Sequence, residues 1–324
     1  MPTAMSSQRG RFAPSPTGEL HLGNARTAIL AWLWARKEGG GFTLRVEDLD
    51  RPRVRAGMAA QQLQELAWLG LDWDEGPHPE TGVESGARGP YRQSLRAPAY
   101  EDAIGRLRDR LYECFCSRAE IAAAASAPHG DEPRYPGSCA ALSSAQRSER
   151  RRVRSPALRF RVSEGSVEFD DAVFGRQRFD VRGAVGDFVV RRADGIHAYQ
   201  LAVVVDDAAM GITQVLRGAD LLASTARQIL HYEALGLPAP RWAHAPLVLS
   251  DGGERLAKRD RSSSLSFLRE TGADPQAVVA ALCAISGQPE ATGRSLLERA
   301  ASFDLARLPR GAVPAPQLTV RSFG

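Results

Sequence analysis

The sequence predicts an α/β protein built around a parallel sheet, and two features of its 324 residues carry that prediction. Residues 11–47 show a strand, a helix and a strand in succession, and sheet-like patterns return between residues 188 and 249. The composition is ordinary for a globular protein, with 43% hydrophobic and 25% charged residues. The length exceeds an average domain, so we expect a central body with an insertion and an appendage.

The first strand, helix and strand indicate where a ligand would bind. Two prolines in residues 11–17 exclude a helix and predict the end of a strand. Apolar residues then recur at helical spacing from Ala25 to the glycines after residue 38, and residues 42–47 alternate as in a strand. Parallel units of this kind bind ligands at the helix N-terminus and beyond the strand ends. Residues 21–24 and Glu47 should therefore lie together.

The remaining elements follow from periodicity and composition. Two further helices with one apolar face each are predicted at residues 59–70 and 100–111. Cysteines, an Ala/Ser/Pro-rich stretch and short strand-like pieces mark residues 113–185 as an insertion. Later elements are expected as strands at 188–191 and 196–205, a helix at 225–235, a buried strand at 246–249, a helix capped by Asp274 and an irregular end after about residue 309.

Charge and hydropathy restrict the partners. No segment reaches the ~20 apolar residues that span a bilayer, and the first ten residues lack the apolar core of a signal peptide, so we expect a cytoplasmic protein without a membrane partner. The net charge is +4, and arginines cluster at 147, 150, 151, 152 and 154, which is typical of either a solvated face or a nucleic-acid contact.

Lysine is rare, which draws attention to where it occurs. Of 42 basic residues only Lys37 and Lys258 are lysine. Lys37 lies at a predicted helix end, where a cation complements the helix dipole. Lys258 has no such structural explanation, and lysine supplies a mobile point charge that arginine does not.

The first turn has no glycine-rich phosphate motif but offers the string HLGN at residues 21–24. His21 can donate to phosphate oxygens, Gly23 permits close backbone approach, and Asn24 can cap the helix. Helix capping alone would also explain the string. The wider context decides between these readings, and it consists of six strings: RFAPSPTGELHLGNARTA (11–28), RVEDLDRPR (45–53), LGLDWDEGP (69–77), YRQS (91–94), VLRGADLL (215–222) and RLAKR (255–259).

In order and spacing these strings resemble the glutamyl-tRNA synthetases, which are class I aminoacyl-tRNA synthetases, over roughly residues 10–265. They most resemble the short glutamyl-queuosine tRNA(Asp) synthetase branch, because only about 65 residues follow the RLAKR loop. The resemblance implies a Rossmann-like catalytic domain with an inserted zinc-bearing subdomain and a short helical appendage. The implied segments are a mobile tail (1–10), catalytic halves (11–112 and 186–250), an insertion with a zinc site and acceptor-contacting strands (113–185), a lysine loop with helices (251–310) and an irregular tail (311–324), without an anticodon-binding domain.

The implied function is that of an ATP-dependent ligase, expected to be a monomer. It would activate L-glutamate as its adenylate, with Mg²⁺ accompanying ATP, and transfer it to queuosine in the anticodon of tRNA(Asp). Three alternatives stay open. They are a truncated glutamyl-tRNA synthetase that charges an acceptor end, a non-catalytic tRNA-binding module, and a nucleotidyltransferase that activates another carboxylic acid.

The resemblance also assigns roles to residues. His21 and Lys258 would be catalytic, and ATP would bind to His21, Gly23, Asn24, Arg255 and Lys258. Arg255 stands where the family usually has a first lysine, and Ala257 where it has serine. Glutamate has two carboxylates and one ammonium, which call for two cations and one anion. The matching positions are Arg11 and Arg217 for the carboxylates, Glu47 for the ammonium, and Ala13, Ser15 and Tyr199 as further lining.

A metal site is expected in the insertion. Cys114 and Cys116 are two apart, so their thiols point to one side of a strand. With Tyr135 and Cys139 they match the family's zinc site of three cysteines and one tyrosine, and three thiolates suit zinc. His129 is a rival fourth ligand, and buried free thiols are the alternative. Cys283 is predicted to be a core residue.

Overall fold

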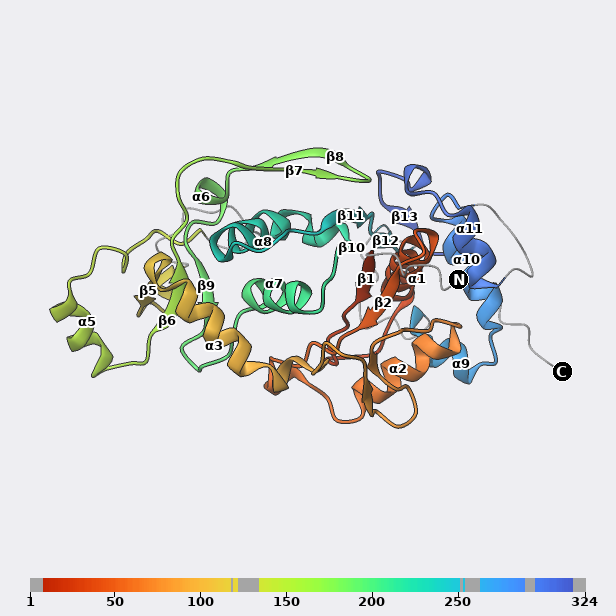
Figure 1. Ribbon diagram of the computed structural model, residues 1–324, viewed down its shortest axis with the longest axis horizontal. Helices are drawn as coiled ribbons and strands as arrows, with labels where there is room; N and C mark the ends of the chain where they lie inside the picture. The colour runs from red at the N-terminus through yellow and green to blue at the C-terminus, as the bar shows by residue number, and fades with distance from the viewer. Residues whose placement is uncertain are drawn as a thin grey trace.

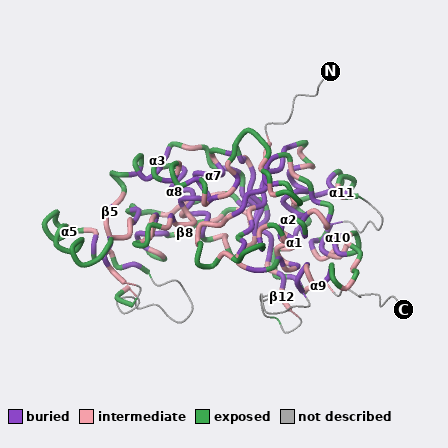
Figure 2. The backbone as a smooth tube through the Cα atoms, turned by 90° about the horizontal axis from the view of Figure 1, so that it is seen from below, coloured by how far each residue is buried: buried purple, intermediate pink, exposed green. Residues whose placement is uncertain are grey.

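The structure is a computed structural model that describes residues 8–117, 119–121, 134–250, 253, 263–288 and 295–316. It is elongated, with an α/β body in the centre, an inserted subdomain at one end and C-terminal helices at the other (Figure 1). Buried residues concentrate in the body, whereas the outer end of the insertion is exposed (Figure 2). Within the described ranges no helix is long and apolar enough to cross a membrane.

The predicted strand, helix and strand are confirmed. They are β1 (Arg9–Phe12), α1 (Leu22–Lys37) and β2 (Gly41–Leu44), and the two strands pair in parallel. The strand β1 begins inside the expected mobile tail, so the tail boundary at residue 10 is wrong. The helix α1 approaches this strand closely at Gly10, where a Cβ would lie 2.9 Å from that of Ala35. The missing side chain lets α1 pack closely on the strand.

The sheet continues beyond β1 with strands that the patterns did not predict. The N–H of Thr213 donates to the carbonyl of Arg9 (2.9 Å), which sets β10 (Gln214–Gly218) beside β1. The strand β10 pairs in parallel with β11 (Arg241–Ala245). Only β12 (Val248–Leu249) falls within the buried strand expected at 246–249.

Three described C-terminal helices adjoin the core around α1, and the last two pack on α1 itself, which is buried on nearly all sides. They are α9 (Leu265–Glu270), α10 (Pro275–Ala284) and α11 (Leu296–Ser302), and Asp274 caps α10 as predicted. Cys283 is buried in this core, as expected. The segment after residue 309 is not wholly irregular, because β13 (Val313–Pro314) pairs with β12.

A second apolar cluster covers the other part of the body, and one predicted strand there is wrong. Its helices are α3 (Ala97–Arg106), α7 (Tyr199–Ala209) and α8 (Leu222–Leu235), whereas α2 (Met58–Trp68) packs in the cluster around α1. Residues 196–205 were expected to form a strand, but from Tyr199 they form α7. The apolar run from Leu201 to Val205 is buried on all sides, and periodicity cannot separate a buried helix from a buried strand.

The insertion has its own antiparallel sheet. Its order is β5 (Leu111–Cys114), β6 (Ala157–Phe160) and β9 (Phe188–Arg191), so residues 188–191 do not resume the central sheet as expected. Leu111, expected as the end of a helix, opens β5 instead. The insertion also contains two short helices, α5 (Ser144–Arg151) and α6 (Val181–Ala184), and a small hairpin of β3 (Gly76–Pro77) with β4 (Glu84–Ser85) precedes it in the chain.

A long hairpin ties the insertion back to the body. It consists of β7 (Val167–Asp171) and β8 (Gly175–Phe179), which run along the top of the molecule in Figure 1. At its tip Asp171 pairs with Trp242 of β11, and Val173 is buried in the core around α1. The insertion therefore reaches into the body at one defined point.

A buried histidine on α8 is expected to make the fold sensitive to acid. His231 is completely buried between the rings of Phe160 and Phe188, and neither ring nitrogen has a hydrogen-bond partner among the described residues. Burial lowers its pKa to about 3. The unfolded chain takes up this proton below about pH 6.5, whereas the folded chain does not. Stability should therefore fall by about 1.4 kcal/mol per pH unit from pH 6.5 towards pH 3.

The variant His231→Phe keeps an aromatic ring and removes this proton uptake. Urea unfolding at several pH values between 7 and 4 should give a flatter pH dependence for the variant than for the wild type. Parallel curves for the two proteins would show that the acid sensitivity has another source.

Candidate active site and cysteine cluster

The N-terminus of α1 opens into a cavity of about 510 Å³ in the body. The cavity is lined by every predicted ATP-site and glutamate-site residue that the structure describes: Arg11, Ala13, Ser15, His21, Gly23, Asn24, Glu47, Tyr199 and Arg217. Residues 246–248 form another wall. Arg255, Ala257 and Lys258 lie outside the described residues.

His21 and Asn24 cap the helix reciprocally. Nδ1 of His21 accepts from the N–H of Gly23 (3.1 Å), and Oδ1 of Asn24 accepts from the N–H of His21 (3.2 Å). Because Nδ1 is an acceptor, the ring proton belongs on Nε2, the nitrogen that can donate to an anion. Gly23 has a local reason as well, since a Cβ there would lie 3.0 Å from the His21 ring. His21 can therefore cap the helix through Nδ1 and bind an anion through Nε2 at the same time.

Arg217, at the end of β10, is held by neutral acceptors. Its Nε donates to Nε2 of His244 (3.1 Å), Nη1 donates to Oε1 of Gln228 (2.8 Å), and Nη2 donates to Oγ1 of Thr225 (2.7 Å). The hydroxyl of Tyr199 lies 3.5 Å from Nη1. In the described part of the chain no carboxylate pairs with Arg217. A buried, oriented cation without a directly paired carboxylate among the described residues thus faces the cavity.

Arg11 and Glu47 are held from below by a buried charge network. Arg45 donates to Oδ1 of Asp207 (2.6 Å) and to Oε1 of Glu47 (3.1 Å). The same Asp207 oxygen lies 3.4 Å from Nε of Arg11. Asp206, also fully buried, lies 3.6 Å from Arg45 and accepts from Arg96 (2.5 Å). These contacts fix the two predicted glutamate-site residues relative to one another.

The network shifts the pKa of both carboxylates. Burial raises the pKa of Glu47, although Arg45 and Arg11 oppose this. Burial also acts on Asp207, but the charges of Arg45 and Arg11 outweigh it and hold its pKa below the ordinary value. Burial raises the pKa of Tyr199, so its hydroxyl stays protonated and can donate. A ligand ammonium beside Glu47 would supply a compensating positive charge.

Four residues that were not predicted from the sequence hold the predicted glutamate-site residues in place. They are Arg45, Asp171, Asp207 and His244. A pair of aspartates directly after the apolar run 201–205 was the available signal for the network, because acidic residues that continue a buried helix must find partners.

A second cavity of about 400 Å³ adjoins the first. Both are lined by Ser15, Glu47 and Tyr199, so the two meet at the predicted glutamate site. Asp50, Arg53 and Arg192 line the second cavity, and Asp50 lies 3.5 Å from Arg192. The arrangement places a mixed-charge chamber beside the point where glutamate is predicted to bind.

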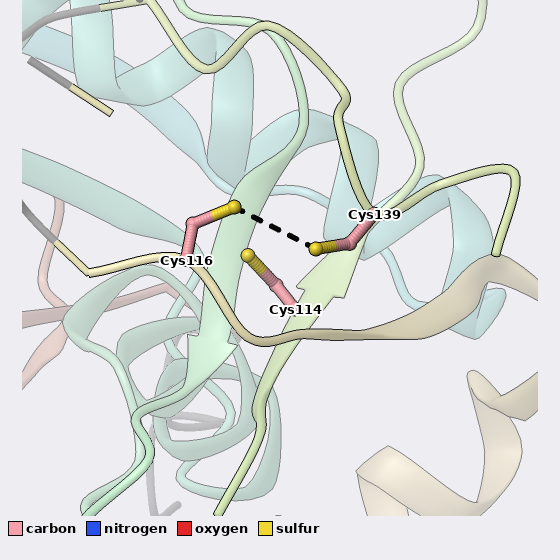
Figure 3. Close-up of side chains that lie close together, drawn as sticks. All are labelled: Cys114, Cys116 and Cys139. Carbon is pink, nitrogen blue, oxygen red and sulfur yellow. Dashed lines mark hydrogen bonds between the residues drawn. The ribbon is translucent and has the colours of Figure 1, made fainter. Parts of the chain in front are cut away.

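The three predicted cysteine ligands meet in the insertion (Figure 3). Their sulfurs lie within 4.8 Å of one another, and Cys116 and Cys139 are 3.6 Å apart. Two sulfurs bound to zinc at about 2.3 Å in tetrahedral geometry would lie about 3.8 Å apart. The Tyr135 hydroxyl is 3.3 Å from the sulfur of Cys114 and 3.9 Å from that of Cys116. The cluster can hold a metal ion, and Tyr135 is placed to complete it, whereas His129 lies outside the described residues.

The arginine cluster lies beside these cysteines, partly on α5. Arg151 pairs with Glu113 (2.8 Å), Arg154 donates to the carbonyl of Phe115 (2.7 Å), and Arg150 lies 4.0 Å from the sulfur of Cys139. These arginines hold the cysteine-bearing strand. The contact with nucleic acid remains a prediction.

Comparisons with known proteins agree with this geometry. The family model for class I tRNA synthetases (E and Q), catalytic domain, matches residues 8–306. A glutamyl-Q tRNA(Asp) synthetase of Symbiobacterium thermophilum is 52% identical, with 96% of this chain and 97% of that protein covered. One of Nocardia farcinica is 51% identical, with 93% and 91% covered.

A solved structure gives the same result for the fold. The glutamate tRNA ligase of Elizabethkingia meningosepticum, in complex with its amino acid, superposes with a TM-score of 0.82 at 29% identity. The match covers 96% of this chain and 67% of that one. Because sequence and fold agree over nearly the whole length, the chain belongs to the class I tRNA synthetases of the E and Q family.

Proposed function

We propose that the protein activates L-glutamate with ATP and transfers it to queuosine in the anticodon of tRNA(Asp). The observation that carries this proposal is the single cavity in which Arg11, Arg217 and Glu47 meet the N-terminus of α1. The acceptor is supported by the names of the relatives from Symbiobacterium thermophilum and Nocardia farcinica, which match this chain along nearly their full length.

Glutamate recognition follows from charge. Arg217 and Arg11 take the two carboxylates, and guanidinium forks suit bidentate pairing. Glu47 takes the ammonium, and the Tyr199 hydroxyl donates a further hydrogen bond. Glutamine would leave one buried guanidinium without its anion, which is the physical basis for rejecting it.

Activation needs positioning and charge neutralisation rather than a nucleophilic side chain. The glutamate carboxylate attacks the α-phosphorus of ATP, and pyrophosphate leaves with the electrons of the broken P–O bond. His21 donates from Nε2 to a phosphate oxygen at the N-terminus of α1, and no acidic side chain in the first turn opposes the anion. Mg²⁺ neutralises the triphosphate as it binds.

Lys258 and Arg255 supply the remaining positive charge. Both flanks of the segment that carries them lie at the cavity, which supports this role. On one side Val248 lines the cavity, and on the other Ser264 pairs with His21 and Leu265 donates to the carbonyl of Leu20 (2.9 Å).

Lys258→Ala should lower the rate of glutamate activation by about a hundredfold or more while glutamate affinity stays near that of the wild type. The reason is that charge develops on the phosphates mainly in the transition state. Pyrophosphate exchange measures the rate and calorimetry the affinity. An equal loss in both would contradict a role in the transition state.

Transfer requires the acceptor nucleoside to reach the adenylate. A hydroxyl oxygen of the nucleoside attacks the activated carbonyl, and AMP leaves as the new ester forms. We place the nucleoside in the second cavity, because Glu47 and Tyr199 line both cavities and because Arg53 and Arg192 supply positive charge there, which suits an anionic backbone.

We propose zinc as the ion of the cysteine cluster, with Tyr135 as the fourth ligand. Thiolates favour zinc, and the N–H of Cys139 donates to the phenol oxygen (3.0 Å), which stabilises negative charge there. Zinc would fix the strand of Cys114 to the segment of Cys139 and so shape the insertion.

Chelation of the metal should loosen the insertion and spare the body. Removal with a strong chelator, or Cys116→Ser, should release about one equivalent of zinc and increase hydrogen exchange in residues 111–117 and 134–142. Cys283→Ser, which alters a buried cysteine in a different core, is the matched control and should retain the metal. A preparation with full hydrogen-exchange protection after complete metal loss would refute the structural role.

Two measurements test the proposed activity. Pyrophosphate exchange is compared with glutamate, glutamine and aspartate, without and with tRNA, and labelled glutamate is then offered to queuosine-containing and queuosine-free tRNA(Asp). The proposal predicts exchange with glutamate and transfer only to the queuosine-containing tRNA. A lack of glutamate-dependent exchange would refute the activity, and equal transfer to both tRNAs would indicate acceptor-end charging.

A further inference from the structure

We infer that Asp171, at the tip of the insertion's long hairpin, is a positioning residue for glutamate recognition that acts through His244 on Arg217. The inference rests on the proposed function in one respect, which is that Arg217 binds a glutamate carboxylate. Asp171 belongs to β7 and His244 to β11, and the two strands pair at Asp171, so the insertion's hairpin would support the amino-acid site where it joins the sheet.

The three side chains form a continuous buried series. Oδ2 of Asp171 lies 2.6 Å from Nδ1 of His244, and Nε2 of His244 lies 3.1 Å from Nε of Arg217. The Asp171 and His244 side chains are completely buried, and Arg217 is 4% exposed. No solvent therefore replaces a lost contact between Asp171 and His244.

Hydrogen-bond chemistry sets the tautomer of His244. A guanidinium can only donate, so Nε2 must present its lone pair to Arg217. The ring proton then lies on Nδ1 and is donated to Asp171. Without an acceptor at Asp171 the opposite tautomer would become available, and its Nε2–H would face the N–H of Arg217. Nε2 could then donate to Oγ1 of Thr225 (3.2 Å) but could no longer accept from Arg217, so the guanidinium would lose this contact.

The two oxygens of Asp171 have different tasks. Oδ1 accepts from the N–H groups of Val173 (3.0 Å) and Phe174 (2.9 Å) in the hairpin turn and from the backbone N–H of His244 (3.3 Å), while Oδ2 contacts the His244 ring. An amide at this position can keep the first task but cannot accept a hydrogen bond on its nitrogen. Asp171→Asn therefore separates positioning from turn formation.

Placing a neutral imidazole between the carboxylate and the guanidinium also preserves the charge of Arg217. A carboxylate in direct contact would compete with the substrate for the same fork of N–H groups. Through His244, Asp171 orients the guanidinium while leaving its charge for the ligand.

The test is Asp171→Asn in pyrophosphate exchange. The KM for glutamate should rise about tenfold to a hundredfold, as expected for one lost hydrogen bond to a charged group, while the KM for ATP stays close to that of the wild type. Asp187→Asn is the matched control, because Asp187 is a buried insertion aspartate that accepts from the Tyr112 hydroxyl (2.6 Å) and the N–H of Val162 (2.8 Å). It should leave the KM for glutamate unchanged.

Two histidine variants keep the inference testable if Asp171→Asn does not fold. The amide of His244→Gln can reach Arg217, whereas that of His244→Asn ends at the level of Nδ1, so the Asn variant should show the larger rise in KM. When His244 is already glutamine, the additional change Asp171→Asn should raise the KM for glutamate little further, because no imidazole tautomer is left to set. The inference would be overturned if Asp171→Asn left the KM for glutamate unchanged or if Asp187→Asn raised it equally. It would also be overturned if Asp171→Asn raised this KM as much in the His244→Gln protein as in the wild type.

Nitrogen NMR of His244 gives a readout that does not depend on activity. The wild type should show a protonated Nδ1 and an unprotonated Nε2, and Asp171→Asn should lose this pattern. A wild type without glutamate-dependent exchange would refute the proposed function, whereas an Nε2–H tautomer in the wild type would refute the positioning role.

Discussion

Replacing Arg217 by methionine is expected to lower kcat/KM for glutamate activation by about two to four powers of ten. The guanidinium is buried, is held by three side-chain acceptors and meets no carboxylate among the described residues, so a substrate carboxylate would be its anion. Removing it would leave that carboxylate desolvated and unpaired, which costs about 3–5 kcal/mol. Pyrophosphate exchange at varied glutamate concentration measures the loss.

Two variants separate this effect from a loss of folding. Arg217→Lys keeps the charge but not the planar fork, and it should fall between the wild type and Arg217→Met. Arg241→Met removes an arginine from the neighbouring strand, where the side chain is 52% exposed, and it should remain active. If Arg217→Met used glutamate as well as Arg241→Met does, the assignment of Arg217 would be wrong.

The residues around the cavity could be predicted from sequence because each belongs to a local string. His21, Gly23 and Asn24 begin a helix whose capping pattern is visible in four letters, and Glu47 ends an alternating strand. The spacing within such strings survives folding, so family resemblance carries over position by position. The cysteine cluster was predictable for the same reason.

Residues that hold the site from a distance could not be predicted. Asp171 and His244 are 73 positions apart, and the residues next to either one in the sequence give no indication that the two side chains meet. The prediction of a strand at 196–205 was wrong for a different reason. A fully buried apolar run has no polar face, so its sequence does not distinguish the period of a helix from that of a strand. The true helix places Asp206 and Asp207 beneath the site, which a strand would not have done.

Replacing Arg45 by methionine should destabilise the fold by about 3–5 kcal/mol. Arg45 is completely buried, donates to Asp207 and Glu47 and lies 3.6 Å from Asp206. Methionine approximates its volume, so the loss would come from three buried carboxylates left without their common cation rather than from a cavity. Urea unfolding at neutral pH measures the change.

Arg36→Met provides the control, because Arg36 also pairs with two aspartates. Its partners Asp72 and Asp74 are 72% and 40% exposed, so solvent can replace the lost charge and the cost should stay below about 1 kcal/mol. Adding Asp207→Asn to Arg45→Met should recover part of the lost stability, since it removes one uncompensated charge. If both arginine variants lost equal stability, the number of ion pairs rather than burial would govern the effect. A large loss in Arg45→Met with partial recovery would mean that the charges that fix Arg11 and Glu47 for glutamate also contribute to folding.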